Sequence, residues 1–131
     1  MNVLIDTQIL IWSFDVNSPL SEHHKKILED PVNKIFVSHV SLMELAIKKN
    51  IKKLPEFIPD IELIATQITN NGFELLRLKD EHIFAYQDLP LFGEHKDPFD
   101  RFLIAVARHE DFVVISTDAK FQLYSSLIKI L

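Results

Sequence analysis

The chain has 131 residues, a length typical of one globular domain, and we expect residues 1–131 to form a single domain. With 47% hydrophobic and 25% charged residues, the composition argues against disorder. The absence of cysteine excludes disulfides and thiolate metal sites. No apolar run is long enough to cross a membrane, and Asp6 interrupts the first one, which argues against a signal peptide. We therefore expect a cytoplasmic protein that does not bind membranes.

The formal net charge of −5 argues against a simple basic surface for nucleic acid. The location of the charge matters more than its sum. If five acids cluster in one site, the rest of the surface is close to neutral. Such a surface is compatible with a nuclease that meets phosphate through a divalent cation.

Short apolar runs alternate with amphipathic segments along the chain, which predicts strands alternating with helices. The expected strands are Asn2–Ile5, Lys34–Ser38, Phe73–Leu78, Phe112–Ile115 and an edge strand, Leu127–Leu131. The expected helices begin near Thr7, Ser21, Ser41, Asp60, Asp80, Asp97 and Ala119. This alternation indicates an α/β fold with three layers, in which helices cover both faces of a central parallel sheet of about four to five strands.

Acids stand where these elements begin and end. Asp6 follows the first strand and Asp118 follows the last core strand. Asp97 and Asp100 open the helix that feeds this last strand, and Glu44 lies near the start of the helix after the second strand. Ligands of open parallel sheets bind beyond the carboxyl ends of the strands, so we expect these five acids to meet at one edge.

Clustered carboxylates point to a metal ion. Two carboxylates about 4 Å apart repel by roughly 4 kcal/mol at an effective dielectric constant of about 20. A cluster must therefore bind protons or cations. Oxygen ligands without cysteine favour Mg²⁺ or Mn²⁺, which can polarise a phosphoryl oxygen and activate water.

Each acid also has a purely structural interpretation. Asp97, Pro98 and Asp100 form a sound helix N-terminus, and Glu44 can complete a capping box with Ser41. Capping explains Asp6 and Asp118 less well, since an acid directly after a buried strand needs a partner. These two residues therefore carry most of the argument for a functional site.

Other polar residues rank lower as candidates. His95 stands beside the acids but is more often a hydrogen-bonding or solvent-facing residue than a base. Arg101 can contact phosphate or pair with a neighbouring carboxylate. His23 and His24 are expected at the surface, and the lysines between positions 48 and 53 on a solvated face.

Four segments, LIDTQILIW, SLMELAIKK, HKDPFDRFLIAVA and VVISTDAKFQLY, together resemble the PIN-domain family. More narrowly, they resemble the VapC-type toxins of bacterial toxin–antitoxin pairs, and HKDPFDR marks one branch of them. The resemblance spans nearly the whole chain and implies a PIN-like fold. It implies that Asp6, Glu44, Asp100 and Asp118 are catalytic and hold the metal ion, with Asp97 as an auxiliary metal ligand. It offers Ser116, Thr117, Arg101 and Thr7 as candidates for substrate contact, Ser116 standing where threonine is commoner.

The activity that the resemblance implies is that of an Mg²⁺- or Mn²⁺-dependent endoribonuclease. In the expected reaction the carboxylates hold the ion, activated water attacks phosphorus, and the 3′ oxygen leaves. Proteins of this type are usually homodimers inhibited by a small cognate antitoxin protein. The alternatives are an RNA-processing nuclease that is not a toxin and a non-catalytic domain that binds RNA or protein.

Two other classes with strand-end aspartates fit less well. A receiver domain requires an aspartate directly after the third strand, where only Asp80 follows, at a helix start. A DxDxT phosphatase requires a second aspartate where Gln8 stands.

Overall fold

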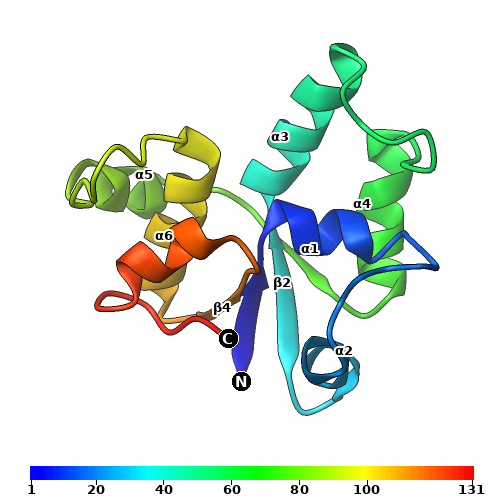
Figure 1. Cartoon of the computed structure of the whole chain (residues 1–131), viewed down its shortest axis with the longest axis horizontal. Coiled ribbons are helices and arrows are strands. Elements are labelled where there is room, and N and C mark those ends of the chain that lie inside the picture. The colour runs from blue at the N-terminus through cyan, green and yellow to red at the C-terminus, as the bar shows by residue number, and fades with distance from the viewer.

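A computed structural model describes all 131 residues and contains a four-stranded parallel sheet in the order β3-β2-β1-β4 (Figure 1). The strands are β1 (Asn2–Ile5), β2 (Lys34–Ser38), β3 (Glu74–Leu76) and β4 (Val113–Ile115). The helices are α1 (Thr7–Trp12), α2 (Glu22–Glu29), α3 (His39–Asn50), α4 (Ile61–Asn70), α5 (Asp80–Gln87), α6 (Pro98–Glu110) and the 3₁₀ helix η1 (Ala119–Tyr124). The predicted three-layer α/β fold, with its parallel sheet, is confirmed.

Successive residues of β1 face opposite sides of the sheet and enter two separate cores. Val3 and Ile5 pack in one core with buried residues of α1, α2 and α4, whereas Leu4 packs in the other with residues of α6 and η1. All three side chains are fully buried, as expected for a parallel sheet covered on both faces. The near-continuous apolar run at the N-terminus is a direct consequence of this double burial.

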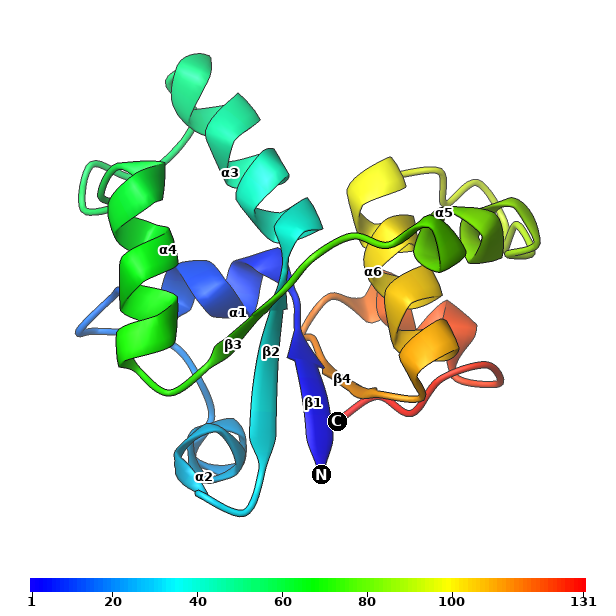
Figure 2. The ribbon, with the colours of Figure 1, turned by 180° about the vertical axis from the view of Figure 1, so that it is seen from behind.

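The helices form two groups on either side of the sheet. Figure 2 shows α3 and α4 on one side and α5 and α6 on the other, with the strands between them and α2 near the start of β2. Both termini lie near the beginning of β1 (Figure 1), so the carboxyl ends of the strands point toward the gap between the two groups. No helix is both long and apolar enough to span a membrane.

The chain leaves the adjacent strands β1 and β4 toward opposite faces of the sheet. Helix α1, which follows β1, contributes Ile9 and Leu10 to the first core. Helix η1, which follows β4, contributes Phe121 and Tyr124 to the second. Open α/β sheets bind their ligands at such a switch point, because the diverging connections leave a crevice between them.

Two local predictions were wrong. Helix α3 begins at His39 and is capped by Ser38, whose hydroxyl accepts the Val40 N–H, so Ser41 and Glu44 form no capping box. Helix α4 begins directly after Asp60, as predicted, although the Asp60 side chain makes no capping bond and pairs with Lys49 at 3.1 Å.

The expected C-terminal edge strand, Leu127–Leu131, is reduced to a single bridge between Val114 and Ile130. Its backbone still bonds to Val114 on both sides, through Lys129 and Leu131. These bonds attach the chain end to β4 without extending the sheet by a regular strand.

Candidate active site

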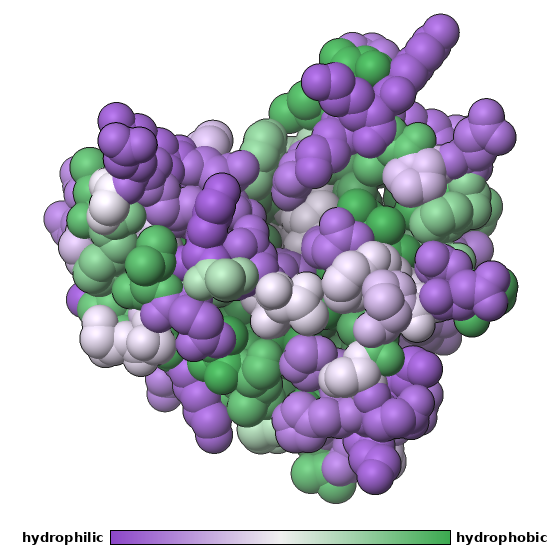
Figure 3. Space-filling view, viewed as in Figure 1, coloured by the Kyte–Doolittle hydropathy of each residue, from purple (hydrophilic) through white to green (hydrophobic).

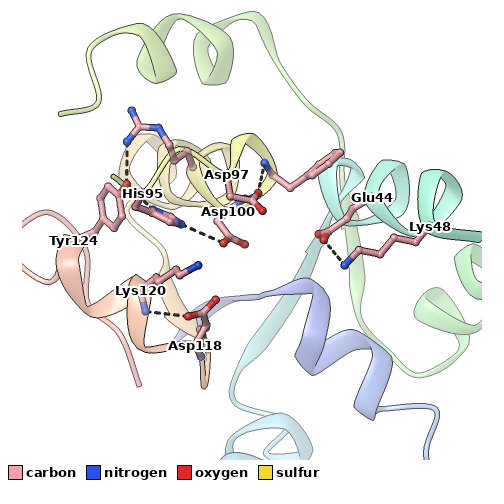
Figure 4. A network of polar contacts seen from close by, with 11 residues as sticks. Glu44, Lys48, His95, Asp97, Asp100, Asp118, Lys120 and Tyr124 are labelled. Atoms are coloured by element: carbon pink, nitrogen blue, oxygen red, sulfur yellow. Dashed lines mark hydrogen bonds and ion pairs between the residues drawn. The ribbon is translucent and has the colours of Figure 1, made fainter. Parts of the chain in front are cut away.

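A cavity of about 200 Å³ lies at the carboxyl ends of β1 and β4, and all five predicted acids line it. The acids are Asp6, Glu44, Asp97, Asp100 and Asp118, and the other lining residues are Thr7, Gln8, Ile11 and Lys48. Figure 4 shows Glu44, Asp97, Asp100 and Asp118 pointing toward a common space from different elements. The surface is hollowed here between the α5–α6 side and the side of α1 and α3, and hydrophilic residues gather around the hollow (Figure 3).

Asp6 and Asp118 each cap the helix that follows their strand. Asp6 Oδ1 accepts the Ile9 N–H at 2.8 Å, and Asp118 Oδ1 accepts the Lys120 N–H at 2.9 Å. The expectation that capping would explain these two acids poorly was therefore wrong. Capping nevertheless holds both carboxylates at the sheet edge, because it fixes one oxygen of each.

Glu44 is not a capping residue, contrary to the prediction. It lies in the second turn of α3, and its Oε2 forms an ion pair of 2.8 Å with Lys48 one turn further on. The Glu44 side chain is mostly buried, whereas Lys48 is partly exposed at the mouth of the cavity. Lys48, expected on a solvated face, thus supplies a positive charge within the acidic cavity.

The two aspartates at the start of α6 have different partners. Asp97 Oδ1 accepts the N–H groups of Phe99 and Asp100, as the N-cap prediction required. Asp100 caps nothing, and its Oδ2 instead lies 3.3 Å from Nε2 of the buried His95. Asp97 is exposed and Asp100 half-buried, so Asp100 reaches deeper into the cavity.

All five acids share one pattern of hydrogen bonding. In each carboxylate, one oxygen accepts a bond from the chain or pairs with Lys48. The second oxygen of Glu44, Asp97, Asp100 and Asp118 forms no hydrogen bond or ion pair, whereas Asp6 also interacts with the Ser116 hydroxyl. The cavity therefore presents carboxylates that are held in place by one oxygen and can bind a ligand with the other.

Burial and mutual repulsion make the negative charge of this cavity unfavourable. Burial raises the pKa of Asp6, with smaller contributions from Asp118 and Glu44, against the opposing effects of the Ser116 hydroxyl and the Ile9 N–H. Burial, followed by the charge of Asp97, raises the pKa of Asp100 to about 6. Both carboxyls would be more readily ionised with a cation beside them.

The donor chemistry fits a hard divalent cation, because five carboxylates, Thr7 and Gln8 line the cavity and Lys48 is the only cation among the lining residues. No three acidic or histidine side chains lie close enough together in this conformation to enclose an ion. Binding of an ion by several of these acids would therefore require their side chains to move from the positions seen here.

The predicted substrate-contact residues divide into three groups. Thr7 lines the cavity, and its hydroxyl donates to Ser41 Oγ at 3.0 Å, which connects α1 to α3. Ser116 is buried beneath the site and accepts the Asp118 N–H at 3.1 Å. Thr117 is exposed and does not line the cavity.

Arg101 is not placed for either expected role, phosphate contact or a carboxylate pair. Its side chain is 4% exposed and donates to the carbonyl oxygens of Leu89 and Pro90 and to the hydroxyl of Tyr124. The sequence offered no signal for this, because the charged side chain is buried by segments distant in the chain.

The structure corrects the placement of His24 and shows His95 as a hydrogen-bonding residue, one of the two roles expected for it. His24 was expected at the surface but is buried in α2, where its Nδ1 has no hydrogen-bond partner. His95 is also buried, and it links Asp100 to Tyr124, whose hydroxyl lies 2.9 Å from His95 Nδ1. Tyr124 was not a candidate from sequence, since an aromatic residue in a C-terminal segment is usually part of the core.

A sequence model of the PIN domain matches residues 3–126. No curated protein sequence is significantly similar to the chain. Among solved structures, VapBC2 of Rickettsia felis bound to promoter DNA is similar with a TM-score of 0.68 and 19% identity, covering 100% of this chain and 98% of that chain. VapBC-5 of Mycobacterium tuberculosis is similar with a TM-score of 0.67 and 15% identity, and the match covers 99% of this chain and 95% of that chain. VapC20 of M. tuberculosis, a toxin that cleaves the sarcin-ricin loop, has a TM-score of 0.60 and 17% identity, covering 92% of each chain.

Proposed function

The chain belongs to the PIN domain family, and from this premise we propose that it is a metal-dependent endoribonuclease whose active site is the acidic cavity. The observation that carries the proposal is the convergence of five carboxylates at the switch point of the sheet. Glu44, Asp97, Asp100 and Asp118 each keep one oxygen free of bonds to the chain. A purely structural role would not require so many unneutralised acids in one cavity.

In this proposal Asp6, Glu44, Asp100 and Asp118 hold Mg²⁺ or Mn²⁺, and Asp97 assists. The bound ion would supply positive charge that stabilises the phosphoryl transition state and lowers the pKa of the attacking water. The capping bonds of Asp6 and Asp118 keep these carboxylates oriented, so less ordering is needed when ligand binds.

Lysines near the acids support RNA as the substrate. Lys48 lines the acidic cavity, and Lys96 and Lys120 line an adjoining cavity of about 550 Å³ that shares Asp97 with it. Figure 4 shows the Lys120 side chain beside Asp118. These cations offer an anionic backbone a path along the acids despite the negative net charge. Thr7 and Ser116 are proposed to assist through their hydroxyls; Thr117 and Arg101 lie outside the cavity.

We further propose that the protein is the cytoplasmic toxin of a toxin–antitoxin pair. Several structural neighbours are complexes of toxins with their antitoxins, which supports a small antitoxin partner. Met43, Ile47 and Ile51, the α3 stripe, lie one helical turn apart and are each about half exposed. Such an apolar stripe on one helix face supports a protein contact, which we assign to a homodimer.

The decisive experiment compares RNA cleavage by the native protein, Asp100→Asn and the control Asp111→Asn. Asp111 is exposed at the opposite end of the same helix and has a left-handed backbone (φ 59°), which asparagine tolerates. We expect cleavage that requires Mg²⁺ or Mn²⁺ and is abolished by chelator in the native protein and the control. Asp100→Asn should lose at least about 100-fold in rate. A native protein with no chelator-sensitive cleavage of any RNA would refute the nuclease assignment, and an active Asp100→Asn would refute the site.

The toxin assignment needs a separate test, because an RNA-processing nuclease would share the same site. Induced expression should arrest bacterial growth with the native protein and not with Asp100→Asn. A small open reading frame beside the gene whose co-expression restores growth would identify the antitoxin partner. Cleavage without growth arrest would favour an RNA-processing nuclease, and binding of RNA without cleavage would favour a non-catalytic domain.

A further inference from the structure

A chain of hydrogen bonds runs from Arg101 through Tyr124 and His95 to Asp100. Arg101 Nη1 lies 2.8 Å from the Tyr124 hydroxyl, which lies 2.9 Å from His95 Nδ1, and His95 Nε2 lies 3.3 Å from Asp100 Oδ2. Figure 4 shows Tyr124, His95 and Asp100 in this order, leading into the acidic cavity. Only Asp100 faces the cavity.

The direction of the bonds follows from the donors available. Arginine can only donate, so the Tyr124 hydroxyl accepts from Arg101. Tyr124 is fully buried, and the only other partner of its hydroxyl is His95 Nδ1. The hydroxyl hydrogen must therefore go to His95 Nδ1, since a buried donor without an acceptor costs about 1–3 kcal/mol.

The state of the His95 ring follows in turn. If Nδ1 accepts, the proton of the ring is on Nε2, which then donates to Asp100 Oδ2. The other tautomer would leave the Tyr124 hydrogen without an acceptor and turn the Nε2 lone pair toward a carboxylate. A doubly protonated ring would also leave the hydroxyl hydrogen unpaired. Only one arrangement satisfies every group in the chain of bonds.

Several contacts fix the position of the Arg101 side chain, so it can anchor the Tyr124 hydroxyl. Its guanidinium also donates to the carbonyl oxygens of Pro90 and Leu89, both at 3.0 Å, and lies 5.3 Å from the centre of the Tyr86 ring. These contacts consume donors that would otherwise be available for phosphate. The buried arginine therefore orients other groups and does not contact substrate.

We propose that His95 and Tyr124 are positioning residues which, anchored by Arg101, fix one oxygen of Asp100 and aim the other into the cavity. This inference rests on the proposed function, because it takes Asp100 to be a metal ligand. Removal of a group that hydrogen-bonds to a metal ligand commonly lowers metal affinity or activity by about 10-fold to 100-fold. Tyr124 acts through His95, and His95 acts through Asp100.

The first test measures the His95 tautomer by long-range ¹H–¹⁵N NMR of the metal-free full chain at about pH 8, above the ordinary histidine pKa. The His95 signals are assigned by their loss in His95→Gln. We expect Nε2–H in the native protein. In Tyr124→Phe the proton should stay on Nε2, because Asp100 still accepts it, but the ¹⁵N shift of Nδ1 should change because this atom loses its hydrogen bond from the tyrosine. His82 is an internal reference, because its Nδ1 accepts the Lys79 N–H in both proteins. A native His95 with its proton on Nδ1, or an Nδ1 shift that is the same in Tyr124→Phe as in the native protein, would overturn the proposed chain of hydrogen bonds.

The second test measures binding of Mn²⁺ alone by calorimetry. Tyr124→Phe should weaken binding about 10-fold. Asp111→Asn, at an exposed position at the opposite end of α6, should leave it unchanged. His95→Gln, which keeps an N–H donor for Asp100, should bind Mn²⁺ more tightly than His95→Leu.

The outcomes separate this inference from the proposed function. Equal Mn²⁺ affinity in the native protein and Tyr124→Phe would overturn the positioning role and leave the nuclease proposal standing. A native protein that binds no Mn²⁺ would overturn both, even if the NMR signals show the expected tautomer.

Discussion

Asp6 and Asp118 cap two helices that leave neighbouring parallel strands toward opposite faces of the sheet. The same bonds that start α1 and η1 hold one oxygen of each carboxylate at the crevice between β1 and β4. Local helix capping and the construction of the acidic cavity are therefore one structural feature. The two acids cannot be replaced without affecting both.

The raised pKa of Asp100 predicts that the acidic cavity lowers stability at neutral pH. Burial and the charge of Asp97 raise this pKa from 3.8 to about 6, so the folded state holds a proton that the unfolded chain has released. Stability should therefore fall as pH rises through this window. In chelator, Asp100→Asn should be more stable than the native protein by about 1 kcal/mol near pH 7.5, after allowance for partial exposure, and equally stable near pH 4. Urea unfolding at the two pH values measures this, and a variant less stable than the native protein near pH 7.5 would contradict it.

Glu110, at the other end of α6, should show the opposite dependence on pH. The hydrogen bond from His82 and, to a smaller extent, Lys79 lower its pKa, so its contribution to stability is present above 4.5 and is lost as pH falls. Glu110→Gln should cost about 1 kcal/mol near pH 7 and nothing near pH 3. Metal affinity should be unchanged. The surface control Glu22→Gln, which loses only an exposed pair with Lys25, should cost much less. If Glu110→Gln lost the same free energy of unfolding at both pH values, the charge of Glu110 could not be the cause of the loss.

Lys48 should compete with a metal ion for Glu44. Its ammonium group lies 2.8 Å from Glu44 Oε2 at the cavity, so its removal frees this oxygen and makes the cavity more negative. Lys48→Gln should therefore raise Mn²⁺ affinity about threefold at low ionic strength, and salt should reduce the difference. The matched control is Lys49→Gln, because Lys49 pairs with Asp60 outside the cavity. Calorimetric titration measures the Mn²⁺ affinity of each variant. Weaker Mn²⁺ binding by Lys48→Gln than by the native protein would show that Lys48 orients Glu44 and does not compete for it.

The α3 stripe should mediate self-association. Ile47 is its central residue, and a buried aspartate there would carry an unpaired charge into the interface. Ile47→Asp should weaken dimer formation at least about tenfold in sedimentation velocity experiments. Val16→Asp, at an isolated residue that is 97% exposed, should have no effect. A dimer unaffected by Ile47→Asp would place the interface on another surface.

The order of the elements and the parallel sheet were predictable from sequence, because both depend on local apolar patterns and on which segments alternate. The N-cap role of Asp97 was predictable for the same reason, since its partners are Phe99 and Asp100. The start of α3 was misplaced, because Ser38 and Ser41 are both capable caps. Only packing against α1, where Thr7 bonds to Ser41, distinguishes them.

The sequence alone also determined that acids stand at the ends of two buried strands, and a parallel sheet brings such ends to one edge. The tertiary structure alone decided what each side chain does there. Arg101 is buried by carbonyl oxygens of Leu89 and Pro90, and Asp100 is bonded through His95 to Tyr124, which follows 29 residues after His95. Partners this distant in the chain leave no periodic pattern, because the bonds depend on how α6 and η1 pack on the same face of the sheet.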